Sequence, residues 1–193
     1  MPPHLTFGKK MTMQFDTIDI SFHHQEGWRS PTGSESPERF TVDFVVNGES
    51  LYSLLDVARY GHVSRFAADF RDRNQEAVDV FLMKKPPDIE GRAILYECSL
   101  CADSGCGVFL VKITRSDQGY VWSEFGFDQG WGDDQFPQLD LERYKGIGPF
   151  SFEAEHYVQT IKRAAEQVVA HQRAISSSIT FQPPSQSRPW ADI

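Results

Sequence analysis

The chain has 193 residues and a formal net charge of −8. This length suits one domain, and the acidity argues against binding to nucleic acid, which needs a basic surface. Hydrophobic residues make up 40% of the chain and include 15 Phe, enough to build a packed core. The sequence shows neither a signal peptide nor a long apolar run, and an odd count of three cysteines favours reduced thiols. We therefore expect a cytoplasmic protein without membrane association.

The composition divides the chain into three parts. Residues 1–10 are expected to form a loose leader, 11–174 a single α+β domain, and 175–193 a Ser/Pro-rich mobile tail. Within the domain we expect an antiparallel sheet of about five strands, packed by a C-terminal helix and one or two shorter helices.

The N-terminal half begins with two segments in which apolar and polar residues alternate. This pattern predicts strands over 11–22 and 40–46, joined by a loop over 25–37 and paired in antiparallel fashion. Ser50 is a typical N-cap for a short helix that ends at Gly61. The region that follows, up to the prolines after Lys85, is compatible with either helix or strand.

The second half contains the strongest strand signals. Segments 93–97, 108–113 and 120–125 are rich in β-forming residues, and alternation places Trp122 and Glu124 on one face of the last strand. Ser151 is predicted to cap the final helix. The apolar stripe of that helix should pack on the sheet, and it comprises Ala154, Tyr157, Val158, Ile161, Ala165 and Val168.

The segment 126–149 mixes aromatic residues with acids and glycines. Aromatic side chains among carboxylates suit an interface with a basic protein, although the same aromatics could instead fill the core. The residues predicted to bind a partner are Asp128, Trp131, Asp133, Asp134, Phe136 and Tyr144.

All three cysteines fall in one C-x2-C-x4-C stretch between two predicted strands: Cys98, Cys101 and Cys106. They could be inert thiols that line a turn, three ligands of a structural zinc ion, or redox or catalytic groups. A redox role usually needs a nearby cation, whereas the flanking charges in the sequence are Glu97 and Asp103.

A tetrahedral zinc site would need a fourth ligand, which the local sequence does not supply. Asp103 is a hard ligand constrained by its own turn. Helical spacing predicts that His156 faces water, whereas His23, His24 and His62 stay open as candidates.

Several of these features together resemble a family of small uncharacterised bacterial proteins. The shared features are the cysteine-bearing hairpin, the Trp122-x-x-Phe125 strand, and a Gly-Pro-Phe-x-Phe sequence at 148–152 before the final helix. The resemblance covers about residues 40–170 and implies one integrated domain. It implies no catalytic role.

We expect a non-enzymatic cytoplasmic interaction protein, an immunity-like or antitoxin-like inhibitor of a protein partner, because no complete catalytic constellation is present and the loop carries aromatics among acids. The alternative is a metal-supported enzyme or redox protein that uses the three cysteines. A small-molecule-binding regulator has no sequence feature of its own.

Overall fold

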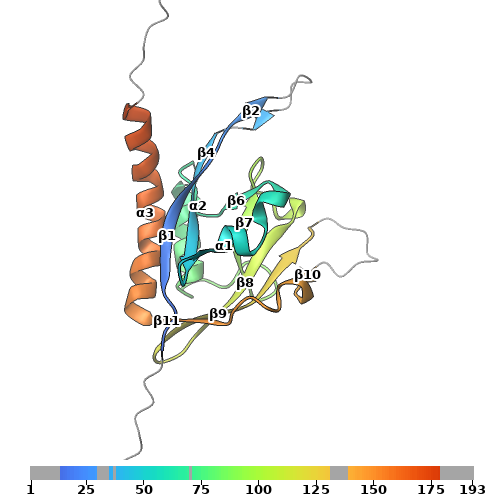
Figure 1. Ribbon diagram of the computed structural model, residues 1–193, viewed down its shortest axis with the longest axis vertical. Coiled ribbons are helices and arrows are strands. Elements are labelled where there is room, and N and C mark those ends of the chain that lie inside the picture. Colours follow the sequence, from blue (N-terminus) through green and yellow to red (C-terminus); the bar gives the residue numbers. More distant parts are fainter. Residues whose placement is uncertain (1–13, 30–34, 37, 70, 131–138, 179–193) are drawn as a thin grey trace, which may run out of the picture.

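The computed structural model describes residues 14–29, 35–36, 38–69, 71–130 and 139–178. It has an α+β fold, as the sequence predicts, with two main antiparallel sheets and a long C-terminal helix α3 (Ala154–Ser178) that lies along β1 (Figure 1). The predicted leader lies outside the described residues. Helix α3 continues four residues past position 174, where the predicted domain ends.

The two N-terminal strands form an antiparallel pair, as predicted, within a sheet of order β1-β4-β5. Strand β1 begins at Ile18, opposite Val46, and residues 14–17 before it are not part of a strand. The strands in this part of the chain are β1 (Ile18–Gln25), β2 (Trp28–Arg29), β3 (Glu35–Ser36), β4 (Arg39–Val46) and β5 (Glu49–Ser50).

The later strands form a second, six-stranded sheet of order β10-β9-β8-β7-β6, with β11 also paired to β9. Their bounds are β6 (His62–Ser64), β7 (Ala93–Cys98), β8 (Val108–Arg115), β9 (Gly119–Asp128), β10 (Leu139–Asp140) and β11 (Phe150–Glu153). The single sheet of about five strands is thus divided in two. The two sheets are joined where β4 bonds to the segment after β6: Val42 N–H donates to Phe66 O (3.0 Å) and Ala68 N–H to Phe40 O (2.9 Å).

A β-bulge in β9 changes which side chains face the core. The register with β8 shifts between Leu110 and Lys112, and Glu124 has a φ of 48°. An extra residue at a bulge breaks the alternation of faces. The prediction that Glu124 shares a face with Trp122 is therefore wrong: Glu124 pairs with Lys112 and Arg92 at the surface, while Phe125 is buried.

The shorter helices lie where the chain changes direction. They are α1 (Leu51–Leu54), η1 (Val57–Tyr60), α2 (Arg71–Phe81), η2 (Ser104–Cys106) and η3 (Glu142–Tyr144). Ser50 caps α1 as predicted, since its hydroxyl accepts the Ser53 N–H (3.1 Å).

The N-terminal cap of α3 differs from the prediction. Ser151 pairs with β9 as part of β11, so the chain stays extended for two residues more. The carboxylate of Glu153 then accepts the N–H groups of Glu155 (3.0 Å) and His156 (2.7 Å). Glu153 is therefore the residue that satisfies the free N–H groups of the first turn.

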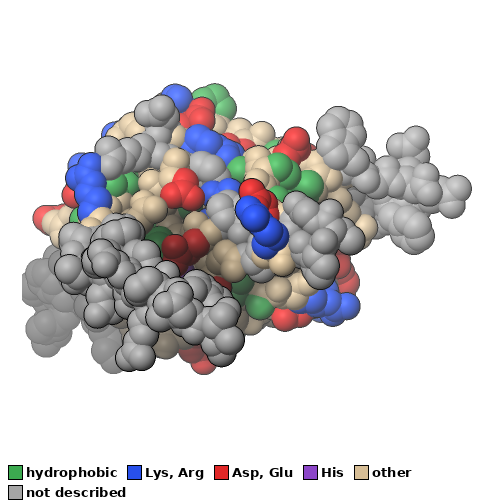
Figure 2. Space-filling model, turned by 90° about the horizontal axis from the view of Figure 1, so that it is seen from above, with side chains coloured by type: hydrophobic (Ala, Val, Ile, Leu, Met, Phe, Trp, Pro, Cys, Tyr) green, Lys and Arg blue, Asp and Glu red, His purple; other side chains and the backbone are tan. Residues whose placement is uncertain are grey.

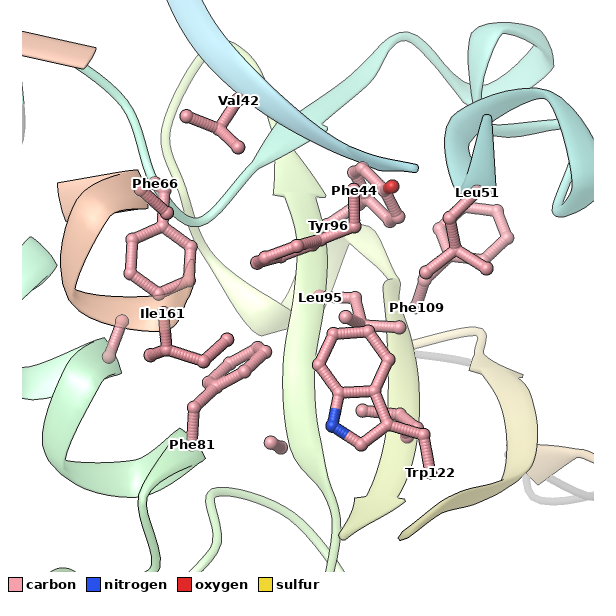
Figure 3. Packing of buried hydrophobic residues seen from close by; sticks show 14 of the residues in the cluster. Val42, Phe44, Leu51, Phe66, Phe81, Leu95, Tyr96, Phe109, Trp122 and Ile161 are labelled. Carbon is pink, nitrogen blue, oxygen red and sulfur yellow. The ribbon is translucent and has the colours of Figure 1, made fainter. Parts of the chain in front are cut away.

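Aromatic side chains from β4, α2 and β9 meet in the core between the sheets and α3 (Figure 3). Phe81 and Trp122 pack edge to face with ring centroids 5.7 Å apart. The indole N–H of Trp122 donates to the hydroxyl of Tyr157 (2.9 Å), which donates to the carbonyl of Phe81 (3.0 Å). Both polar groups are buried, and the relay satisfies them while joining β9, α3 and α2.

Asp43 is a buried carboxylate held by three donors. It accepts hydrogen bonds from the Ser50 hydroxyl (2.6 Å), the Tyr52 N–H (3.0 Å) and the Tyr96 hydroxyl (2.9 Å). Burial, followed by the charge of Asp43, raises the pKa of Tyr96 well above its usual value, so this phenol stays a donor. The cluster ties β4 to α1 and β7.

The surface seen in Figure 2 carries acidic and basic side chains interspersed, with hydrophobic atoms in small patches. Within the described residues, no helix is both long enough and apolar enough to cross a membrane.

Candidate metal centre

The three cysteines meet at one end of the β7–β8 hairpin. Cys98 ends β7, Cys101 follows in the turn, and Cys106 ends η2 just before β8. All three thiols are free, their Sγ atoms lie within 4.8 Å of one another, and those of Cys101 and Cys106 are 3.4 Å apart. The structure thus brings together the three ligands that the sequence predicts for a metal ion.

Residues 98–102 form a turn whose backbone N–H groups lower the pKa of the Cys98 thiol. The turn is closed by the Ala102 N–H, which donates to the carbonyl of Cys98 (2.9 Å), and Ala102 has a φ of 52°. Burial by itself would raise the pKa of the Cys98 thiol. The N–H groups of Cys101 and Leu100, together with the neighbouring thiols, outweigh burial and lower it. This sulfur is therefore prepared to act as an anionic ligand.

The second turn holds Cys106 through Asp103. One carboxylate oxygen of Asp103 accepts the Gly105 N–H (2.7 Å), and its carbonyl accepts the Cys106 N–H (3.2 Å). Because Cys106 shares hydrogen bonds with Cys101 and Cys98, its pKa rises to about 12. In the metal-free protein Cys106 is thus the thiol that keeps its proton. Asp103 is used by its own turn, as the sequence suggests.

Two arginines distant in sequence hold the carbonyls of the cysteine turn. Arg39 of β4 donates to Ser99 O and pairs with Asp69 (3.1 Å). Arg73 of α2 donates to Ala102 O (3.4 Å) and pairs with Glu97 (2.8 Å). The sequence shows only the acidic neighbours of the cysteines, so these cations are a feature that spacing could not reveal.

Glu97 precedes Cys98 in β7 and is 1% exposed. Burial raises its pKa, and the charges of Arg73 and Arg65 oppose that rise. One carboxylate oxygen accepts from Arg73, while the other has no hydrogen-bond partner among the described residues. Glu97 therefore anchors Arg73 under the turn.

His62 lies opposite Cys98 in the β6–β7 register, so it is the histidine closest to the cysteines by strand pairing. Its Nδ1 is 2.8 Å from Tyr60 O and its Nε2 is 2.7 Å from Gly107 O. Both ring nitrogens thus lie against carbonyl oxygens, and His62 does not join the cysteine group. His62 therefore links β6 to the start of β8.

The other histidines considered as ligands lie in different contacts. His23 packs against Tyr52, and His24 pairs with Glu38. His156 is exposed, as predicted, and its Nε2 lies 2.7 Å from Ile18 O. In the part of the chain that the structure describes, no histidine or carboxylate joins the cysteine group.

Four of the residues predicted to bind a partner lie outside the described residues: Trp131, Asp133, Asp134 and Phe136. The other two are buried. Asp128 is 9% exposed and accepts the Gly130 N–H (2.9 Å), and Tyr144 is 3% exposed in η3. Their side chains pack within the protein, and the predicted interface stays a prediction.

Gly130 brings the chain after β9 against the cysteine turn. A Cβ atom at this position would lie 2.3 Å from Gly105 O, and its φ is 70°. Only glycine fits such an approach of two backbones. The end of β9 thus supports η2 from the side.

A separate cavity of about 300 Å³ lies beside η3 and the start of β11. Apolar groups of Phe125, Ile147 and Pro149 line it, and Glu124 at its edge is already paired with Lys112 and Arg92. It contains no cysteine, so it forms no part of the metal centre.

No protein-family model matches the chain, and neither the curated proteins nor the solved structures contain a match.

Proposed function

We propose that the protein binds one Zn²⁺ ion through Cys98, Cys101 and Cys106, and that this centre is its functional site. The observation that carries the proposal is the convergence of three free thiols. Sulfur ligands 2.3 Å from zinc stand about 3.8 Å apart on a tetrahedron. The sulfurs of Cys101 and Cys106 are 3.4 Å apart and all three lie within 4.8 Å of one another, so small side-chain rotations would suffice.

The exposure of the thiols favours a metal site over inert packing. A structural cysteine without a ligand is usually buried as a small hydrophobic residue, whereas Cys101 and Cys106 are exposed. The lowered pKa of Cys98 makes its thiolate easier to form, and zinc would displace the thiol protons on binding. Arg39 and Arg73 donate to carbonyls of the same turn and are paired with Asp69 and Glu97, so they fix the backbone that carries the thiols.

The zinc would also support the structure around it. The three ligands span the connection between β7 and β8, and the two arginines link that connection to β4 and α2. An ion that binds only the folded state at about 100 times its dissociation constant adds about 2.7 kcal/mol to stability.

The test is metal analysis of the reduced protein. We expect one zinc per chain after reconstitution and gel filtration, and a lower melting temperature when a chelator removes it. Single Cys→Ser changes at the three positions should each weaken zinc binding. Ser104→Ala is the matched control, because it removes a hydroxyl from the same exposed turn and no sulfur.

If the protein binds no zinc and a chelator does not change its melting temperature, the proposal is contradicted. The cysteines would then be inert thiols that line a turn. Equal zinc content in the three serine variants would also contradict it. The predicted inhibitor role is a separate hypothesis, since most of its residues lie outside the described part of the chain.

A further inference from the structure

The cysteine group contains every thiol of the chain. The sequence has three cysteines, and all of them converge at the β7–β8 turn. Zinc in proteins is almost always four-coordinate. A fourth sulfur ligand would therefore come from outside this chain.

The neighbouring groups that could serve instead have contacts elsewhere. Both ring nitrogens of His62 lie at carbonyl oxygens. Asp103 accepts the Gly105 N–H, and Glu97 is buried against Arg73. Across residues 14–29, 35–36, 38–69, 71–130 and 139–178, no other His, Asp, Glu or Cys reaches the group. These residues leave the fourth position open.

The open position faces solvent. Cys101 and Cys106 are exposed, while Cys98 is partly covered by its own turn. A small ligand can therefore reach the metal past the two exposed sulfurs. Sites with three protein ligands and an open position bind water or a substrate there.

Charge and softness select the ligand class. Three thiolates and Zn²⁺ carry a net charge of −1, so the metal is electron-rich and polarises water weakly. Soft sulfur donors match such a site better than oxygen donors do. The carboxylates of Asp69 and Glu97 already balance the guanidinium groups of Arg39 and Arg73, so the softness of the metal site selects a sulfur donor.

We propose that the fourth position binds a low-molecular-weight thiol as its thiolate. This inference rests on the zinc site proposed above. In the binding step the S–H bond of the thiol breaks, a metal–sulfur bond forms, the bound water leaves and the proton passes to solvent. No electron is transferred, and the bound thiolate is held at neutral pH, where a free thiol is mostly protonated.

Cobalt(II) in place of zinc gives a visible readout of the ligands. The reduced protein is kept in a phosphine reductant, loaded with one Co²⁺, and titrated with 2-mercaptoethanol. The charge-transfer absorption from thiolate to cobalt should rise by about one third as three thiolates become four. It should saturate at one equivalent of bound thiol, with cobalt retained after gel filtration.

Ethylene glycol is the matched probe, because it differs from 2-mercaptoethanol only in having oxygen in place of sulfur, and it should leave the spectrum unchanged. The inference is overturned if 2-mercaptoethanol does not alter the three-thiolate spectrum, or if the added thiol removes the cobalt from the protein. Neither result would contradict the proposed metal site. A four-thiolate spectrum before any thiol is added, with a dimeric mass by light scattering, also overturns the inference. Failure to bind cobalt or zinc at all overturns the proposed function itself.

Discussion

In the core, the indole of Trp122 and the hydroxyl of Tyr157 donate to partners within the chain, whereas at the cysteine turn two thiols face solvent. The two regions lie in the same sheet and use it differently. The core relay satisfies buried polar groups completely, which favours one packed state. The turn fixes its backbone equally well, through Asp103, His62 and Arg39, but presents its sulfurs outward. Rigid backbone with exposed ligand atoms is what a binding site requires.

The two regions should differ most in how much a side-chain truncation lowers the free energy of unfolding, with the larger loss in the core. Trp122→Ala should lower the free energy of unfolding by about 3–5 kcal/mol, because it leaves a large cavity and removes the partner of Tyr157. Leu100→Ala in the cysteine turn, where Leu100 is 53% exposed, should change it by no more than about 0.5 kcal/mol. Urea denaturation of the metal-free proteins measures both. Similar losses in the two variants would break the distinction.

A smaller effect should appear in metal affinity when His62 is changed. His62→Leu removes the hydrogen bond to Gly107 O beside Cys106, and loss of such a supporting contact typically costs about 10–100-fold in affinity. His62→Gln keeps an N–H donor and should recover part of the loss. His156→Leu, a histidine on α3 bonded to Ile18 O, is the control and should bind zinc like the original chain. Competition with a chromophoric chelator gives the dissociation constants; equal values for all variants would exclude a supporting role.

The smallest effect concerns the order in which the thiols react in the metal-free protein. Cys98 has a lowered pKa and Cys106 a pKa of about 12, so thiolate forms at Cys98 at the lower pH. Iodoacetamide, which reacts with thiolate, should label Cys98 first as pH rises from neutral, with Cys106 following only in strong alkali. Tandem mass spectrometry of the peptide resolves the two sites. Because Cys106 is the more exposed thiol, labelling of Cys106 first would show that access, and not charge, decides reactivity.

Local patterns predicted much of this fold. Alternation located β4, the content of β-forming residues located β7, β8 and β9, and Ser50 was correctly predicted as a cap. The division into two sheets was not predictable, because the choice of strand partners depends on contacts between segments far apart in the chain. The bulge at Glu124 could not be predicted from the sequence either, because glutamate has no preference for a positive φ.

The candidate site was predictable in its ligands and not in its surroundings. Close spacing was enough to bring Cys98, Cys101 and Cys106 together. Arg39 and Arg73 approach the turn from β4 and α2, 60 and 29 residues away from their acceptors. Such contacts depend on the assembled fold, and a single sequence carries no signal for them. The same holds for His62, whose role follows from strand register.

The three thiols lie close along the chain as well as in space, since the last cysteine is eight positions after the first. Closing that short loop costs about 1.8 kcal/mol less chain entropy than closing the 60-residue loop from Arg39 to Ser99. An ion could therefore organise the β7–β8 hairpin before the two sheets meet. In that case zinc would act on the rate of folding as well as on the lifetime of the folded state, since a contact formed early lowers the barrier to folding.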